Sequence, residues 1–214
     1  GVLATDYGTP TVFGTSNLSF LVDQYYFTPS LAWAINSCHS IGLSLNISYN
    51  RLGVHGLENS TSFSVHPSDL TNRGVDAEWG FGVTFGWLGN FMDCLTLGVS
   101  YETKNWVEKF ARYRGLEPEG GNFSTPSTFW LGAACFLSDY FVLSTDFGYH
   151  LWNTVPAYGN TSNTNQPDGA PSGPGLGWRN QFVFKLGAAF DFLPCWTARV
   201  GYNFGQQVVP TREL

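Results

Sequence analysis

Hydrophobic and polar residues alternate along much of this chain. In LTLGVSYETK (residues 95–104), the apolar side chains of Leu95, Leu97, Val99 and Tyr101 alternate with small or polar ones. A period of two places the two sets on opposite faces of a β-strand. The apolar face needs an apolar neighbour, which is a protein core in a globular fold and lipid in a membrane barrel.

The same alternation recurs in seven other segments, so eight strands are predicted. The other seven are 31–35, 43–49, 79–87, 129–135, 141–147, 182–190 and 198–204. Short turns and long polar segments alternate between the strands. The long segments are 51–75, 105–125 and 153–178. Tight turns at one end and long loops at the other are typical of an antiparallel transmembrane β-barrel, with the long loops extracellular.

The start of the chain is less regular. Residues 1–16 are rich in Gly, Thr and Pro and are predicted to form no strand. From Asn17 the chain becomes apolar, until Pro29 interrupts it. Proline has no N–H to donate to a neighbouring strand and is confined to edges, bulges and strand starts. A kink is therefore expected at Pro29, where a gap in the barrel wall is a further hypothesis.

Composition supports the barrel over a soluble β-sandwich. Only 12% of the 214 residues are charged, 17% are aromatic and 25 are glycines, whereas soluble domains usually carry about twice that charge. A sandwich binding module would place charged residues on the exposed strand faces, and the Leu, Val and Phe faces contain none. The net charge of −6 gives no basic surface for nucleic acid. No apolar run reaches the roughly 18 residues of a membrane-spanning helix.

Three segments resemble the FadL/TodX family of outer-membrane transporters for long-chain fatty acids and other hydrophobic compounds. They are LTLGVSYETKNWVEKFARYRGL (95–116), GWRNQFVFKLGAAF (177–190) and CWTARVGYNFGQQVVP (195–210), with weaker support from residues 28–52 and 79–89. The resemblance implies fourteen strands around an N-terminal hatch. The eight strands predicted here correspond to the fourth to eleventh, and no hatch is recognisable. The chain, a single partial barrel domain (1–214), is thus expected to be an internal fragment.

The resemblance also implies an apolar groove between two extracellular loops, which captures the ligand first. The loops correspond to 51–75 and 105–125. The candidate groove residues are Leu57, Phe63, Val65, Leu70, Trp106, Val107, Phe110 and Leu116. Such a groove removes an amphiphile from water and passes it inward. The alternative is that these residues only pack the loops together.

The predicted inner faces of the strands contain three cations. Lys104, Lys185 and Arg199 are candidates for binding a fatty-acid carboxylate by charge-assisted hydrogen bonds. The alternative is that they neutralise neighbouring acids and solvate the lumen.

Catalysis is not expected. Asp146 and His150 share a face, but residues four apart on a strand lie about 13 Å apart, beyond hydrogen-bond reach. No GxSxG sequence is present, and no catalytic residue, metal site or cofactor is predicted.

All four cysteines fall near the short turns, on the predicted periplasmic and oxidising side. Cys38, Cys94, Cys135 and Cys195 are compatible with disulfides between adjacent turns, with cross-links to other envelope proteins, or with a role as small packing residues.

The sequence thus predicts a cell-outer-membrane barrel that contacts membrane lipid and takes up hydrophobic small molecules, such as fatty acids, passively. The alternative is a self-contained eight-stranded structural or adhesion barrel, in which the first and eighth strands pair.

Overall fold

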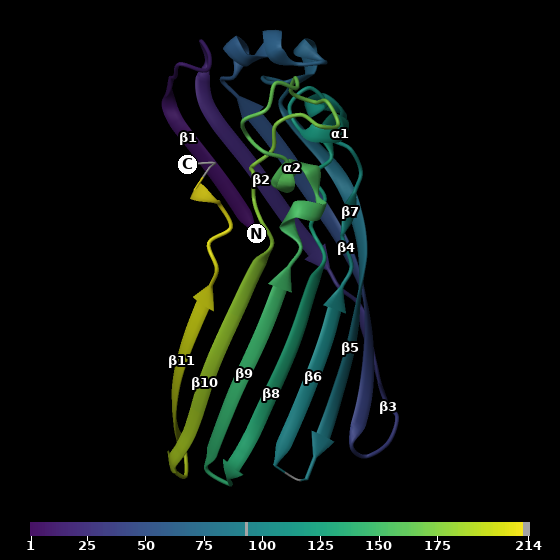
Figure 1. The fold of residues 1–214 in the computed structure, drawn as a ribbon, viewed down its shortest axis with the longest axis vertical. Helices are drawn as coiled ribbons and strands as arrows, with labels where there is room; N and C mark the ends of the chain where they lie inside the picture. The colour runs from purple at the N-terminus through teal and green to yellow at the C-terminus, as the bar shows by residue number, and fades with distance from the viewer. Residues whose placement is uncertain (93, 212–214) are drawn as a thin grey trace.

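The computed structural model describes residues 1–92 and 94–211, which form one large antiparallel sheet (Figure 1). The strands are β1 (Val2–Pro10), β2 (Asn17–Phe27), β3 (Ser30–Ala34), β4 (His39–His55), β5 (Val75–Phe91), β6 (Leu95–Glu102), β7 (Trp106–Val107), β8 (Thr128–Ser138), β9 (Phe141–His150), β10 (Gln181–Leu193) and β11 (Trp196–Gly205). Their order is β1-β2-β4-β5-β6-β8-β9-β10-β11, with β3 paired to β4 and β7 to β5.

The register of the sheet places residues of the same kind on the same face in neighbouring strands. Ser100 of β6 lies opposite Trp130 of β8, and Asp146 of β9 lies opposite Lys185 of β10. These residues share one face, the inner face, which is rich in glycine and small polar residues. The opposite, outer face contains large apolar side chains that are about half exposed, including Leu43, Phe85, Leu131 and Leu186. This two-faced antiparallel wall agrees with the predicted transmembrane β-barrel fold, although the described residues form an open sheet.

The sheet does not close on itself. In the part of the chain that the structure describes, β1 pairs only with β2, and β11 pairs only with β10. The segment predicted as the first strand forms β3 and pairs with β4 rather than with β11. A self-contained eight-stranded barrel requires that missing pairing, so this arrangement does not support it.

The predicted number of strands was too low. The described residues contain eleven, and the prediction that residues 1–16 form no strand is wrong, because β1 pairs with β2 from Val2 opposite Asp23 to Pro10 opposite Asn17. This pairing supplies the backbone hydrogen bonds that the weak local alternation does not reveal. Strands β4 and β5 also extend to His55 and from Val75, so they continue into the predicted 51–75 loop.

The strand is interrupted at Pro29, where the sequence predicts a kink. Strand β2 ends at Phe27, opposite Ile47, and β3 begins at Ser30, opposite Ser44. The register is the same on both sides, and Leu45 N donates to Pro29 O at 3.1 Å. The proline therefore interrupts the strand without separating it from β4.

The apolar core lies at the long-loop end of the sheet. It contains the buried side chains of Leu52, Val54, Val107, Phe110 and Tyr113. Short helices surround it: η1 (Glu58–Phe63), η2 (Pro67–Asp69), η3 (Ala111–Tyr113), α1 (Pro118–Gly121), η4 (Trp152–Thr154) and α2 (Pro156–Gly159). Among the described residues, none of the helices is long and apolar enough to cross a membrane.

Candidate functional site

The three long loops form one hydrogen-bonded unit above the sheet, here called the loop cluster. Val65 N donates to Asp168 O at 3.0 Å, and Asp168 N donates to Phe63 O at 2.9 Å. Gly120 N in turn donates to Gly169 O at 3.1 Å. Since these bonds join all three loops through their backbones, the loop cluster is a folded cap and not a set of independent loops.

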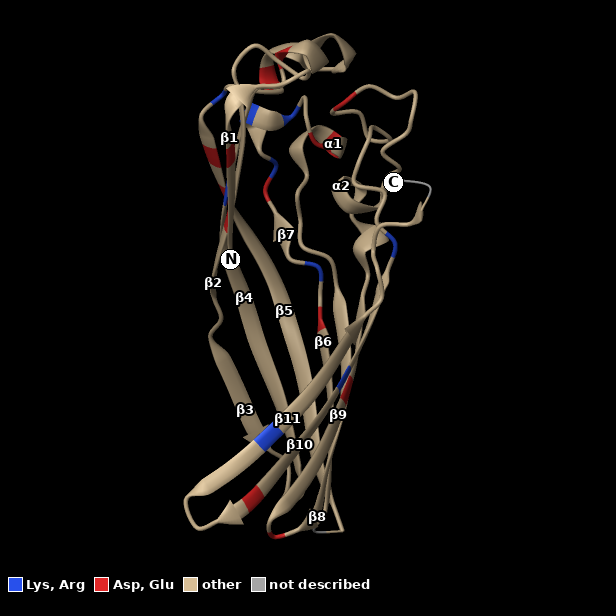
Figure 2. Cartoon of the chain, turned by 90° about the vertical axis from the view of Figure 1, so that its left-hand side faces the viewer, with Lys and Arg blue, Asp and Glu red and all other residues tan. Residues whose placement is uncertain are grey.

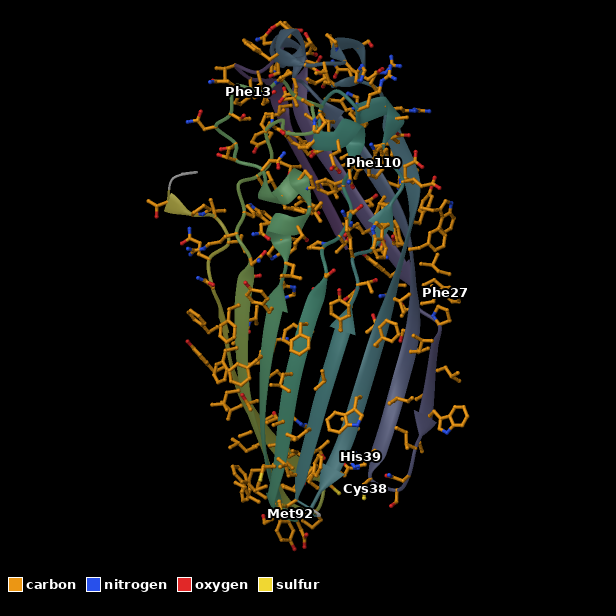
Figure 3. The ribbon with its side chains drawn as sticks, turned by 45° about the vertical axis from the view of Figure 1, so that its right-hand side comes forward. Phe13, Phe27, Cys38, His39, Met92 and Phe110 are labelled. Carbon is orange, nitrogen blue, oxygen red and sulfur yellow. The ribbon has the colours of Figure 1, made fainter. Side chains whose placement is uncertain are left out.

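Five of the eight candidate groove residues lie inside this cap. Leu70, Val107 and Phe110 are buried, and Leu57 and Leu116 pack against the same core in partly buried positions. Figure 3 shows Phe110 at the loop end. These five residues pack the loops together and form a buried apolar layer beneath the loop surface.

The other three candidates are exposed and separate. Phe63 and Val65 are 72% and 43% exposed and border a hollow of about 570 Å³ together with Gln166 and Pro167. Trp106 is 57% exposed, opposite Phe81 on the outer face. The structure therefore brings only Phe63 and Val65 to one open surface.

Charged residues gather around the loops (Figure 2). Asp69 pairs with Arg114 at 2.6 Å and with Arg73 at 3.7 Å. Burial raises the pKa of Glu117 to about 7, and the nearby Asp168 carboxylate adds to the shift. Burial also raises the pKa of Asp168 itself. The loop cluster thus holds two acids that ionise less readily than usual.

Below the loop cluster, a β-bulge places the Asn105 side chain on the inner face. The five residues of β5 from Thr84 to Gly80 lie opposite the six residues from Glu102 to Val107, so one residue is extra. The Asn105 side chain is fully buried, and its Nδ2 donates to Asn46 O at 3.1 Å. This hydrogen bond connects Asn105 to β4 across the intervening strand β5.

A polar layer forms around that bridge. Ser48 Oγ donates to Asn105 Oδ1 at 2.8 Å, Asn50 Nδ2 donates to Ser48 Oγ at 2.8 Å, and Asn46 Nδ2 donates to Thr84 Oγ1 at 2.8 Å. All three residues from β4 are at least nine-tenths buried. The layer separates the apolar loop core from the lower inner face on the β4–β5 side.

The lower inner face is hollowed by glycines. A cavity of about 410 Å³ is lined by Gly42, Gly86, Gly98 and Gly132, and Trp130 and Asp146 border it. The Trp130 indole lies against Gly148, where an added Cβ would be 2.6 Å from ring carbons. The glycines therefore provide both the open surface and the space for the indole.

The candidate cations occupy different parts of the wall. Lys185 Nζ lies 4.5 Å from the centre of the Trp130 ring, a cation–π distance. Arg199 is exposed on the neighbouring strand β11. Lys104 is partly buried in the bulge next to β6, which β8 and β9 separate from β10. Lys185 and Arg199 thus lie on neighbouring strands, and Lys104 does not join them.

An aromatic series connects the loop cluster to Lys185. Its neighbouring ring centres are between 5.1 and 5.9 Å apart. The members are Phe123, Tyr158, Trp178, Trp152, His150 and Trp130. The sequence analysis did not single out this series. Alternation places Trp130 and His150 on one face, but only the folded loop brings Trp152, Tyr158 and Trp178 above them.

The cysteines are free in the structure. Cys38, Cys94 and Cys195 are exposed and Cys135 is partly exposed, without a disulfide among the four. Disulfides between adjacent turns, one of the roles that the sequence leaves open for these cysteines, are therefore not formed in the structure. Cys135 lies opposite Leu95, so the residue next to Leu95, Cys94, belongs to the other face. Among the described residues, no group of three His, Cys, Asp or Glu side chains could hold a metal ion.

Comparison with known proteins identifies the fold. No family model and no curated protein sequence matches the chain. The TodX ΔS2S3 mutant monoaromatic hydrocarbon channel matches with a TM-score of 0.68 and 15% identity, over 98% of this chain and 63% of that one. The fold is that of this channel. The CymD monoaromatic hydrocarbon channel matches with a TM-score of 0.60 and 18% identity, over 96% and 64%.

A Pseudomonas aeruginosa FadL homologue also matches, with a TM-score of 0.64 and 16% identity, over 90% of this chain and 51% of that one. The resemblance to the FadL/TodX family is thus confirmed at the level of the fold. The chain spans less than two thirds of the length of these structural relatives. The TodX mutant and CymD are named as channels and not as enzymes.

Proposed function

We propose that this protein forms the wall and the loop cluster of an outer-membrane β-barrel channel for passive uptake of small hydrophobic molecules. The observation that carries the proposal is the two-faced wall. Its outer face presents half-exposed Phe, Leu and Trp side chains, whereas its inner face is lined by glycines and small polar residues. Lipid is the environment that suits such an outer face. The channels of the same fold support transport as the purpose of the inner face.

The proposed first contact is the hollow beside Phe63 and Val65. A hydrophobic molecule that covers these side chains removes apolar surface from water, which contributes about 25 cal/mol per Å². Leu57, Leu70 and Phe110 would act from beneath, by holding the loops in place. Trp106 would instead contact lipid, since it lies on the outer face.

The proposed route then follows the β8–β10 side of the wall. The buried polar layer around Asn105 is a poor environment for an apolar molecule, because displacing it would leave hydrogen-bonding groups unpaired. The aromatic series provides apolar surface on the other side and leads to Lys185. For a long-chain fatty acid, Lys185 and Arg199 are the proposed partners of the carboxylate, and Lys104 a separate one.

The test is ligand binding by the whole chain folded in detergent. The folded chain is expected to migrate as a heat-sensitive compact band, and toluene or oleate is expected to raise the temperature at which the band is lost. Quenching of tryptophan fluorescence by a brominated fatty acid would report binding near the aromatic series. A compact band that neither ligand stabilises would contradict transport and favour a structural barrel.

A further inference from the structure

The outer face of the sheet carries one Lys or Arg within the described strands. The Lys and Arg residues of the strands are Arg51, Lys185 and Arg199. Lys185 lies opposite Asn203, four residues from Arg199, so both cations are on the inner face. Arg51 is eight residues from Leu43 along β4 and therefore lies on the outer face.

An aromatic pair lies directly beside Arg51 on the membrane side. Tyr49 and Trp79 are opposite each other on β4 and β5, and their ring centres are 5.1 Å apart. Trp87 is on the same face of β5, about 26 Å further towards the short turns at 3.3 Å per residue. Aromatic residues at both ends of an apolar band of about 25 Å mark the two membrane interfaces. Arg51 lies about 7 Å beyond Tyr49, at the level of the lipid headgroups on the long-loop side.

The Arg51 guanidinium faces outward from a buried partner. Its Nη1 donates to Asp23 Oδ2 at 3.2 Å, and the Arg51 side chain is 38% exposed against 5% for Asp23. Asp23 Oδ2 is the one acceptor that the described residues give this guanidinium, which has five N–H donors. The ion pair thus has its positive end at the surface, with donors left for an acceptor outside the protein.

Two more arginines at the start of β5 have the same arrangement. Arg112 Nη1 donates to Arg73 O at 3.2 Å and to Val75 O at 3.4 Å, two positions along β5 from the residue opposite Arg51. The side chains of Arg73 and Arg112 are 50% and 55% exposed, whereas those of their aspartate partners are 11% and 12% exposed. The surface above the aromatic pair is therefore formed by guanidinium groups, with the carboxylates behind them.

This combination selects one kind of ligand. Guanidinium groups bind phosphate through paired N–H donors, and exposed rings on the membrane side cover acyl chains. Glu108 is an exposed acid next to Trp79, and the exposed Lys109 follows it, so the flank has no excess of negative charge. A free phosphate would use only the arginines, whereas a lipid with a phosphorylated sugar headgroup would use both the arginines and the rings.

We propose that Arg51, together with Arg73 and Arg112, binds the phosphate groups of lipopolysaccharide in the outer leaflet, with its acyl chains against Tyr49 and Trp79. The inference rests on the proposed function, which puts the long loops on the outside of the outer membrane. The bound lipid is not the transported molecule. It holds the outer end of β4 and β5 at the membrane surface.

The test measures binding of fluorescently labelled lipopolysaccharide to the whole chain folded in detergent, by fluorescence anisotropy. Unlabelled lipid A with both phosphates should compete at least tenfold better than dephosphorylated lipid A or phosphatidylglycerol. Inorganic phosphate at the same concentration should not compete. High salt should weaken binding, because the headgroup contacts are exposed to solvent.

Variants locate the site on the outer face. R51Q alone would leave the buried Asp23 carboxylate unpaired, so D23N/R51Q removes both charges together. We expect it to weaken lipopolysaccharide binding about tenfold, as for a lost charge-assisted hydrogen bond, and Y49A/W79A to weaken it as well. The matched control is R179Q, because Arg179 is exposed but lies just before β10, far along the sheet from β4. The heat-sensitive band confirms that each variant is folded.

The outcomes separate this inference from the proposed function. Equal binding by the parent and D23N/R51Q would overturn it, and so would equal competition by dephosphorylated lipid A, phosphatidylglycerol or inorganic phosphate. Oleate and toluene binding are measured on the same samples, and both should be unchanged in D23N/R51Q. A chain that binds these ligands while its lipopolysaccharide binding is insensitive to Arg51 contradicts the lipid site alone. A chain that needs Arg51 for lipopolysaccharide but binds neither ligand contradicts uptake alone.

Discussion

Ser48 Oγ of β4 donates a hydrogen bond to Asn105 Oδ1 over a distance of 2.8 Å, although β5 lies between β4 and β7, the short strand that follows Asn105. Two features of the sequence make the contact: the bulge that follows Glu102, and glycine at position 80 of β5. A side chain at Gly80 would occupy the space between the two polar groups. This hydrogen bond marks the position along the sheet where the loop cluster ends and the open inner face begins.

Replacing Asn105 by alanine should destabilise this layer. The substitution removes the acceptor of the buried Ser48 hydroxyl and the side-chain donor to the main-chain oxygen of Asn46. We expect the free energy of unfolding to fall by about 1–3 kcal/mol, measured by urea unfolding of the detergent-folded chain. The matched control is N153A, because Asn153 is exposed. An equal effect of both substitutions would show that the buried bridge contributes nothing.

Two glycines on the same face of β5 should respond differently to alanine. A methyl group at Gly80 would collide with Asn105 Oδ1 and Ser48 Oγ, whereas at Gly86 its nearest neighbour would be Val99 O, 3.9 Å away. G80A should therefore lose about 1–3 kcal/mol of stability, and G86A should fold like the parent. The heat-modifiable band on a gel gives the comparison. Similar melting of the two variants would contradict the close approach of Asn105.

The wall could be predicted from sequence because each strand alternates over many residues. Leu95 to Tyr101, for example, lie in β6 with the apolar set on the outer face. Strand β1 could not be predicted, since its residues are exposed and only its pairing with β2 makes it a strand. A pairing partner is a long-range property that a local pattern does not contain.

The candidate site was less predictable than the wall. Hydrophobicity marks Phe110 and Phe63 alike, yet one is 1% and the other 72% exposed. The difference depends on how three loops fold together, and the Val65–Asp168 hydrogen bond that joins two of them spans about a hundred residues of sequence. The bulge at Asn105 likewise depends on the space that glycines leave on a neighbouring strand.

Those two phenylalanines provide the next experiment. F110A should destabilise the loop cluster by about 3–5 kcal/mol, because it leaves a cavity in a buried core. F63A should leave stability unchanged, within about 0.5 kcal/mol, since the side chain is exposed, but should weaken binding of oleate or toluene. Urea unfolding and tryptophan quenching measured on the same samples separate these effects. Unchanged ligand binding in F63A would contradict the hollow beside Phe63 and Val65 as the capture site.

Lys185 should distinguish acids from neutral ligands. K185Q removes the cation that lies over Trp130 but keeps a polar side chain of similar length. We expect binding of decanoate to weaken about tenfold, which is typical of a lost charge-assisted hydrogen bond, and binding of toluene to remain. K109Q is the control, because Lys109 lies in the loop cluster, where its Nζ donates to Glu119 O. An equal loss for both ligands would instead indicate a change in the shape of the inner face.

The loop cluster should lose stability as the pH rises from about 4.5 to about 7. The pKa of Glu117 is about 7 in the folded chain, because of burial and the nearby Asp168, against an ordinary value of 4.5. The folded state therefore keeps a proton that the unfolded state has already released in this range. The stabilisation is fully present below pH 4.5 and is lost as the pH passes through 7. The groups that face Glu117 are Asp168 and Tyr158, whose own pKa is raised by burial.

Urea unfolding followed by tryptophan fluorescence at pH 4.5, 6, 7 and 8 measures this slope. E117Q should remove it, since glutamine does not titrate. E58Q should leave the slope unchanged. Hydrogen bonds lower the pKa of Glu58 to about 2, with the largest effect from Ser16. The stability that the ionised Glu58 contributes is therefore lost only below pH 4.5. A slope that survives in E117Q would assign the titration to another group, and Asp168→Asn would then be the variant to compare, because burial raises the pKa of Asp168 as well.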